Sequence, residues 1–277
     1  MQVVGPISEI RVLRQKLSGT VGFVPTMGYL HEGHLALVKQ ARMDNSTVIV
    51  SIYVNPAQFG PREDFGAYPR EINRDLELLR GEGVDIVFVP SDEEMYPPEF
   101  SSWVDVEKVT ERLEGASRPG HFRGVATVVA KLFNIVQPSR AYFGQKDAQQ
   151  VVVIKRMVAD LNMGIGIVVV PTVRESDGLA MSSRNIYLSP EERQAATILF
   201  RALTLARQLR QGGENDAGKI RRQMTSLIQK EPLARIDYVS IADAETLEEL
   251  NLIDRPALAS LAVRIGKTRL IDNMPLE

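Results

Sequence analysis

The chain has 277 residues, of which 44% are hydrophobic, 25% are charged and none is cysteine, and its formal net charge at neutral pH is -2. A chain of this size can form one large domain or two of ordinary size, and its charge gives no general attraction to nucleic acid or to an anionic membrane. The absence of cysteine excludes disulfide bonds and thiol catalysis.

No segment of the sequence has the pattern of a membrane anchor. Residues 1–10 lack a charged start followed by an apolar stretch, and the longest apolar runs, such as 165–170, are far shorter than the roughly 20 residues of a membrane-spanning helix. We therefore expect a cytoplasmic protein with no membrane partner.

Short apolar stretches alternate with helical patterns over the first 170 residues. The expected strands are residues 20–24, 47–53, 86–89, 141–143 and 165–170. One helix is expected after the first strand, with Leu35, Val38 and Ala41 on its apolar side, and another over 71–80. A third has the apolar stripe Val125, Val128, Val129, Leu132 and Val136. A fourth has the stripe Val151, Ile154, Val158 and Leu161. This alternation predicts an α/β fold with a parallel sheet covered on both faces, whose ligands bind beyond the carboxyl ends of the strands.

The pattern changes after Pro171, which ends the last of these strands. A polar segment follows, and we place a domain boundary there, between domains 1–174 and 175–277. The second domain is predicted to contain helices over about 190–210 and 216–230, a strand at 237–241 and a hairpin around Gly266 and Lys267. Such a smaller, mixed α+β domain could act as a lid.

The most informative motif joins the first predicted strand to its helix. Its residues are Pro25, Thr26, Met27, Gly28, Tyr29, Leu30, His31, Glu32, Gly33 and His34. The glycines leave room for a ligand and the N–H groups of a helix start favour negative charge, so the motif predicts a phosphate site. His31 and His34 are three residues apart and can reach the same phosphates. Zinc is disfavoured, because the zinc-protease signature requires a four-residue histidine spacing.

Two further segments are ambiguous from their residues alone. Asn55 and Gln58 follow the predicted strand 47–53, where an amide can orient a polar substrate or simply belong to a turn. Arg118 and His121 lie in a loop before a helix, which is compatible with an anion site or with a solvated loop.

A lysine follows the predicted strand 141–143 and the glycine after it. Lys146 can neutralise charge that grows on a phosphate under attack, or it can be an ordinary surface charge. Gln150 falls one turn into the next helix, where it can face the same cleft. Residues 181–185 offer two serine hydroxyls and Arg184 to phosphate oxygens, although serines before a helix are commonly only caps.

Taken together, these motifs resemble a known family. His31-Glu32-Gly33-His34 and Met181-Ser182-Ser183-Arg184 resemble the paired phosphate-binding motifs of the nucleotidyl-transferase superfamily that includes class I aminoacyl-tRNA synthetases. The whole set is more closely similar to the pantothenate synthetase family of pantoate and β-alanine ligases. The match spans nearly the full length, through Pro25-Thr26-Met27-Gly28, Val54-Asn55-Pro56, Gln58-Phe59-Gly60, Tyr68-Pro69-Arg70, His121-Phe122-Arg123-Gly124, Gly144-Gln145-Lys146-Asp147 and Met181-Ser182-Ser183-Arg184-Asn185.

The resemblance implies an ATP-dependent ligase that works in two steps. The pantoate carboxylate attacks the α-phosphate of ATP to give pantoyl adenylate and pyrophosphate, and the β-alanine amine then displaces AMP. It also implies a Rossmann-like domain followed by a smaller closing domain, a homodimer, and magnesium carried with the ATP. We expect no nucleic acid partner.

The resemblance assigns site residues by motif. ATP would be held by Met27, Gly28, Tyr29, Leu30, His31, Glu32, Gly33, His34, Gly144, Gln145, Lys146, Asp147, Val173, Met181, Ser182, Ser183 and Arg184. The expected catalytic residues are His34, His31 and Lys146. Gln58 and Gln150 would hold pantoate, and Gln58 is also a candidate contact of β-alanine.

One departure from the family concerns the metal. The helix after residues 68–70 has Arg74 and Leu78 where some relatives carry acidic or amide side chains linked to the metal, and only Asp75 remains nearby. We therefore name no protein ligand for magnesium.

Three alternative functions remain at this point. An adenylyltransferase of the same superfamily would use the same histidines without releasing AMP. A non-catalytic nucleotide-binding regulator is opposed by the intact lysine and histidines, and a tRNA-binding relative is opposed by the lack of a basic C-terminal face.

Overall fold

The computed structural model describes residues 1–61 and 63–277 and confirms the predicted α/β fold. The chain forms two compact units, which we call the first unit (Met1–Gly144 with Gln150–Pro171) and the second unit (Gln145–Gln149 with Thr172–Glu277). The division into domains 1–174 and 175–277 stays a prediction about how the chain folds and moves.

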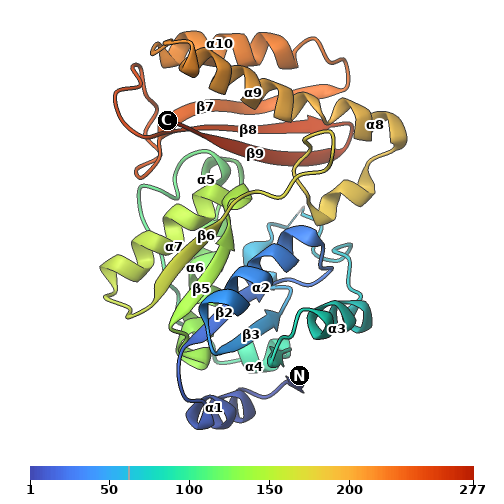
Figure 1. Cartoon of the computed structure of the whole chain (residues 1–277), viewed down its shortest axis with the longest axis vertical. Helices are drawn as coiled ribbons and strands as arrows, with labels where there is room; N and C mark the ends of the chain where they lie inside the picture. The colour runs from blue at the N-terminus through green and yellow to red at the C-terminus, as the bar shows by residue number, and fades with distance from the viewer. Residues whose placement is uncertain (62) are drawn as a thin grey trace. The chain divides into compact units, whose positions relative to one another are not determined.

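The first unit is built on a six-stranded parallel sheet with the order β1-β4-β3-β2-β5-β6 (Figure 1). Its strands are β1 (Gln2–Val4), β2 (Val21–Thr26), β3 (Thr47–Ile52), β4 (Ile86–Phe88), β5 (Arg140–Gly144) and β6 (Gly166–Val170). The five predicted strands are all present. Strand β1 is absent from the prediction, because only one of its three residues, Val4, is buried, whereas all three residues of β4 are.

Helices cover both faces of this sheet. They are α1 (Ile7–Lys16), α2 (Glu32–Asp44), α3 (Ile72–Gly81), α4 (Asp92–Met95), α5 (Glu114–Ser117), α6 (His121–Val136) and α7 (Ala148–Asp160). The first two residues of α7 belong to the second unit. Val24 and Val50 of the sheet share one apolar core with Val38 of α2. Phe23 and Ile49, which alternate with them along the strands, are also fully buried. Burial on both faces explains why these strands are continuously apolar.

Helix α7 differs from the prediction, and the short helices α4 and α5 are absent from it. Leu161 lies beyond the end of α7 and is 53% exposed, whereas Val153 and Met157, outside the predicted stripe, are buried. Helix α1 is also missing from the prediction, because Ile10 is its only buried residue and leaves no apolar stripe.

The second unit contains a three-stranded antiparallel sheet with the order β7-β8-β9. The strands are β7 (Ala234–Asp243), β8 (Ala257–Ile265) and β9 (Thr268–Leu276), and the helices are α8 (Pro190–Ala195), α9 (Ile198–Gln211) and α10 (Ala217–Ile228). Apolar side chains of α9 and α10 form one core with those of β8 and β9. The hairpin at Gly266 is confirmed, and the glycine is needed there because φ is +56°.

The predicted helix over 190–210 is divided into α8 and α9. The break lies at Thr197, whose backbone N–H bonds to the carbonyl three residues back and whose hydroxyl donates to the same Gln194 oxygen. These local bonds compete with the regular helical pattern. Across the described parts of both units, no helix combines the length and apolar character that crossing a membrane requires.

Candidate active site

The turn between β2 and α2 has a backbone that only a few residues tolerate. Gly28 has φ +80°, and a Cβ there would lie 3.0 Å from Asp75 Oδ2 and from Ile52. Tyr29 follows with φ +51°. Thr26 Oγ1 accepts the N–H of Gly28 at 3.2 Å and donates to the Ser51 carbonyl at 2.8 Å. The turn is therefore a tight, defined structure at the carboxyl edge of the sheet.

Helix α3 holds this turn through a buried carboxylate. Asp75 is 1% exposed, and its two oxygens accept the N–H groups of Tyr29 at 2.7 Å and Leu30 at 2.8 Å. Burial raises the pKa of Asp75, and the two N–H bonds oppose that rise. Arg74 donates to the Leu30 carbonyl at 3.0 Å. Asp75 thus anchors the turn, with both of its oxygens engaged by the backbone.

The two histidines of the turn brace each other. His31 is the N-cap of α2 and accepts the Gly33 N–H on Nδ1 at 3.1 Å, while His34 accepts the His31 N–H on its own Nδ1 at 3.3 Å. Their ring centroids lie 4.1 Å apart. The two rings are therefore neighbours at the start of α2, and the capping bonds fix their orientation.

Gln58 lies on the short helix η1 (Pro56–Gln58), which follows β3. Its Nε2 donates to Met27 Sδ at 3.1 Å, and its Oε1 accepts from Asn55 Nδ2 at 3.0 Å. Asn55 is 1% exposed and also accepts the Tyr96 hydroxyl at 2.8 Å. Gly124 lets α6 approach η1, because a Cβ there would lie 2.2 Å from the Ala57 carbonyl. The predicted pantoate residue is therefore held next to the predicted ATP turn.

The Arg118 and His121 segment is not a solvated loop, because His121 begins α6 and Arg118 forms an ion pair with Glu63. Arg118 binds Glu63 with its Nε at 2.7 Å and NH2 at 2.6 Å and donates to His121 Nε2 at 3.0 Å. His121 Nδ1 then donates to the Gln58 carbonyl at 2.8 Å. Burial and the Arg118 charge lower the pKa of His121 to about 4. This chain of hydrogen bonds runs from Glu63 through Arg118 and His121 and holds the backbone of Gln58.

Gly144 and Gln150 flank the lysine turn and belong to the first unit, whereas the turn itself, η2 (Gln145–Asp147), belongs to the second. A Cβ on Gly144 would meet open space, so the glycine is not required by close packing. Gln150 is half-buried in the first turn of α7.

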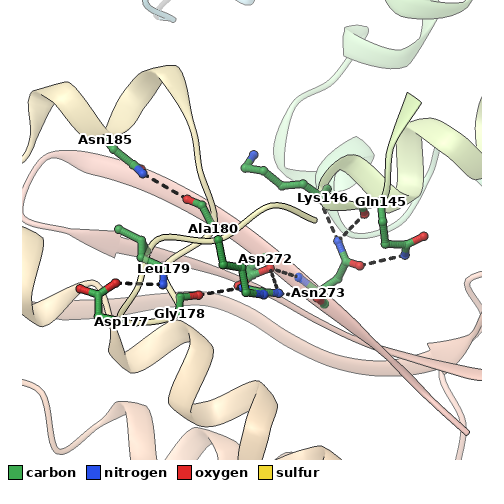
Figure 2. A network of polar contacts seen from close by, with 10 residues as sticks. Gln145, Lys146, Asp177, Gly178, Leu179, Ala180, Asn185, Asp272 and Asn273 are labelled. Atoms are coloured by element: carbon green, nitrogen blue, oxygen red, sulfur yellow. Dashed lines mark hydrogen bonds and ion pairs between the residues drawn. The ribbon is translucent and has the colours of Figure 1, made fainter. Parts of the chain in front are cut away.

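The lysine turn is fixed by β9. Figure 2 shows Asn273 facing Gln145 and Lys146, and its Nδ2 donates to the carbonyls of both, at 2.9 and 2.8 Å. The Lys146 side chain is 20% exposed, and its Nζ lies 3.7 Å from Asp147 Oδ1. The predicted cation is thus held on a rigid backbone.

The segment that follows Pro171 folds back on itself and presents the serine motif. The Met181 N–H bonds to the Val173 carbonyl at 3.0 Å, which joins two predicted ATP residues. Ser182 caps η3 (Ser183–Tyr187) by accepting the Arg184 N–H at 3.3 Å. Ser183 is buried.

The predicted site residues therefore form two sets. The first unit contains residues 27–34, Gln58, Gly144 and Gln150, and the second contains residues 145–147, Val173 and 181–184. Asp272 and Asn273 are missing from the sequence prediction, together with the role of Arg174. The available signal was the pair of consecutive polar residues inside the otherwise apolar end of β9.

No group of three or more potential metal-binding side chains occurs among the residues that the structure describes. Asp75, the carboxylate that remains near the positions linked to the metal in some relatives, already accepts two backbone N–H groups. The described side chains therefore do not form a cluster suited to a protein-bound metal.

Comparisons with known proteins cover the whole chain. The family model described as pantoate-beta-alanine ligase matches residues 2–275. The pantothenate synthetase of Roseiflexus sp. strain RS-1 is 60% identical over 277 residues, covering 100% of both chains. That of Herpetosiphon aurantiacus is 60% identical over 275 residues and covers 99% of each chain.

Solved structures give the same result. The crystal structure of pantothenate synthetase from Thermus thermophilus has a TM-score of 0.95 and 50% identity, and covers 99% of both chains. The pantoate-beta-alanine ligase from Francisella tularensis, complexed with beta-gamma ATP and beta-alanine, has a TM-score of 0.82 and 35% identity, covering 99% of this chain and 97% of that one. The similarity therefore extends over both units.

Proposed function

This chain belongs to the pantoate-β-alanine ligase family, and we propose that the two turns described above carry the first chemical step of its reaction. The enzyme condenses pantoate with β-alanine in an ATP-dependent reaction that passes through pantoyl adenylate and releases AMP and pyrophosphate. The predicted family and activity are confirmed, and the adenylyltransferase alternative finds no support in these relatives. Residue roles, magnesium, assembly and location are proposals.

The two histidines support ATP binding at the first turn. Because Nδ1 of each ring accepts a backbone N–H, the neutral ring carries its proton on Nε2 and donates from there. Two such donors at the start of α2 suit phosphate oxygens, on which charge grows during attack. The reciprocal bonding of His31 and His34 is the observation that carries the proposal, because it orients both rings before any ligand binds.

Lys146 supplies the positive charge in this proposal. It meets the charge that develops at the α-phosphate, and the remaining residues of the two sets, Met27, Gly28, Tyr29, Leu30, Glu32, Gly33, Gly144, Gln145, Asp147, Val173, Met181, Ser182, Ser183 and Arg184, complete the ATP site. In the first step a pantoate carboxylate oxygen bonds to the α-phosphorus, and the bond to the pyrophosphate oxygen breaks. In the second step, the β-alanine amine bonds to the acyl carbon and loses a proton. The bond from the acyl carbon to the bridging oxygen breaks, and AMP leaves with that oxygen, which came from the pantoate carboxylate.

Gln58 and Gln150 hold pantoate in this proposal. The support for Gln58 is its fixed amide, which Asn55 orients and whose Nε2 already donates to Met27 Sδ. A thioether is a weak acceptor, so a pantoate oxygen would replace it at little cost. Gln58 would also contact β-alanine, whose amine must approach the same carboxylate.

Magnesium would reach the site on the phosphates of ATP. The support is that the Asp75 oxygens are engaged by the backbone, so ATP itself is the better ligand. We also propose that the enzyme is a homodimer and works in the cytoplasm, where ATP is supplied. Sedimentation equilibrium measures the assembly directly: two chains per particle supports the homodimer, and one contradicts it.

Isotope transfer tests the proposed chemistry. The enzyme is incubated with ATP, magnesium, β-alanine and pantoate that carries ¹⁸O in its carboxylate. One labelled oxygen should appear in AMP, because that oxygen bonds to phosphorus in the first step and leaves with AMP in the second. Formation of ADP and labelled inorganic phosphate would replace the adenylate by an acyl phosphate and contradict the proposal.

A further inference from the structure

We propose that Asn273 is a positioning residue for adenylation, because it holds the backbone that aims Lys146. The proposal rests on the role proposed above for Lys146. It concerns residues of the second unit alone and assigns a function to β9, the last strand of the chain.

The Asn273 amide uses all of its hydrogen-bonding groups on the lysine turn. Its two Nδ2 hydrogens go to the successive carbonyls of Gln145 and Lys146, at 2.9 and 2.8 Å, and its Oδ1 accepts Gln145 Nε2 at 3.0 Å (Figure 2). The residue is 4% exposed, so water does not substitute easily for these bonds. Two donors and one acceptor on a short side chain are available only from an asparagine amide.

A buried ion pair holds Asn273 in turn. Asp272 Oδ1 accepts the Asn273 N–H at 2.8 Å, and Arg174 binds the two Asp272 oxygens at 2.6 and 3.0 Å. Asp272 is 3% exposed. Burial raises its pKa, while Arg174, and more weakly the charge of Lys146, oppose the rise. The carboxylate thus depends on Arg174 for its charge compensation.

The same arginine ties this network to the serine motif. Arg174 also donates to the Gly178 carbonyl at 3.0 Å and lies over the Phe200 ring at 4.7 Å. It follows Val173 directly, and the Val173 carbonyl accepts the Met181 N–H. Contacts through β9 therefore connect the lysine turn with the start of the 181–184 motif.

Single-turnover kinetics of three variants test the proposal. Formation of pantoyl adenylate is measured at saturating ATP for Lys146→Ala, for Asn273→Ala and for the double variant. Because small misplacements of a catalytic group cost up to about 100-fold, we expect Asn273→Ala to slow adenylation about 10- to 100-fold. The double variant should be no slower than Lys146→Ala, since Asn273 acts through that lysine. Transfer from preformed pantoyl adenylate to β-alanine should stay within about twofold of wild type.

Met274→Ala is the matched control for a general loss of stability. Met274 is the next residue of β9 and lies in the apolar core of the second unit, so its truncation destabilises the same strand while the hydrogen bonds of Asn273 to residues 145–146 stay available. Its melting temperature should fall while its adenylation rate is kept. Asn273→Ser, which keeps one short donor, is the second variant if Asn273→Ala does not fold, and its rate should lie between those of wild type and Lys146→Ala.

The outcomes separate the two proposals. Slow adenylation by Lys146→Ala with a wild-type rate for Asn273→Ala, or fully multiplicative losses in the double variant, would overturn the role of Asn273 alone. A wild-type adenylation rate in Lys146→Ala would instead overturn the role of the lysine. Equal slowing by Met274→Ala and Asn273→Ala would reduce Asn273 to a contribution to stability and would also overturn its positioning role.

Discussion

The two turns of the candidate site are held by opposite chemistry. The turn after β2 is held by its N–H groups, which donate to the carboxylate of Asp75 on α3. The turn after β5 is held by its carbonyls, which accept from the neutral amide of Asn273 on β9. The first turn therefore has a carboxylate bound to the N–H groups of Tyr29 and Leu30. In the second turn, the carbonyls that would repel phosphate are paired with the Asn273 amide. Its lysine, Lys146, is then available to stabilise charge.

A second difference follows from the titratable groups. All three histidines of the chain lie in the first unit. The lysine turn is held by the Asn273 amide, which the ion pair of Arg174 and Asp272 supports in turn. Each turn therefore has one support whose pKa is shifted: burial lowers the pKa of His121 to about 4, and burial raises the pKa of Asp272.

The largest effect is expected from the side chains that would meet the phosphate. His34→Ala and Lys146→Ala should each lower kcat by at least about 10² to 10³-fold, or ~2.7 to 4 kcal/mol, because each removes a preorganised donor to a developing oxyanion. Steady-state kinetics with all substrates saturating measures this loss. Lys146→Arg should not restore the full rate, since its planar guanidinium places the charge elsewhere. A loss below fivefold in both alanine variants would remove these side chains from the chemistry.

Acid should destabilise the first unit through His121. The pKa of His121 is lowered to about 4 in the folded chain, whereas its ordinary value is near 6.5. Between pH 6.5 and 4 the unfolded chain therefore binds a proton at this residue and the folded chain does not. This stabilisation is complete above pH 6.5 and is lost as the pH falls to 4, with a total of roughly 3 kcal/mol. Urea denaturation between pH 7 and 4 measures it.

His121→Gln is the control for this prediction. Its amide can donate to the Gln58 carbonyl and accept from Arg118 without titrating, so its free energy of unfolding should depend less on pH than that of wild type. Identical pH dependence in the two proteins would show that His121 is not the acid-sensitive group.

Removing the charge of Asp75 tests the anchor of the first turn. Asp75→Asn keeps one acceptor but turns an NH₂ group toward a backbone N–H, so the bond to Tyr29 or Leu30 is lost. We expect an unfolding free energy lower by about 1.5 to 3 kcal/mol and a higher KM for ATP, because a hydrogen bond to a charged group is lost. Denaturation curves and ATP titrations provide the two readouts. If the variant is destabilised but its KM for ATP is unchanged, Asp75 contributes to stability and not to ATP binding.

The smallest effects should fall on pantoate alone. Gln58→Ala and Gln150→Ala should raise the KM for pantoate through loss of about 1 to 3 kcal/mol each, because a substrate polar group is left unpaired. The KM for ATP should change little, which a parallel ATP titration checks. Equal changes for both substrates would place these amides outside a pantoate pocket.

Elements with local signals were predictable from the sequence. The alternation of apolar strands and helices predicts the parallel sheet, and His31 and His34 at a helix start predict the paired rings, because both depend on spacing within a few residues. Asn273 contacts a turn that is 127 residues away in the chain, and no local pattern reports such a distance. Arg118 illustrates the same limit, since its partner Glu63 decides whether it is a solvated charge or a support for Gln58.

The most direct measurement separates the two half-reactions in rapid-quench experiments with His34→Ala and Lys146→Ala. In one arm the enzyme receives ATP, magnesium and pantoate, and pantoyl adenylate is quantified within a single turnover. In the other it receives preformed pantoyl adenylate and β-alanine. We predict slow adenylation in both variants and transfer close to the wild-type rate. Adenylation at the wild-type rate, with slow transfer to β-alanine, would contradict the assignment of these residues to the phosphate chemistry.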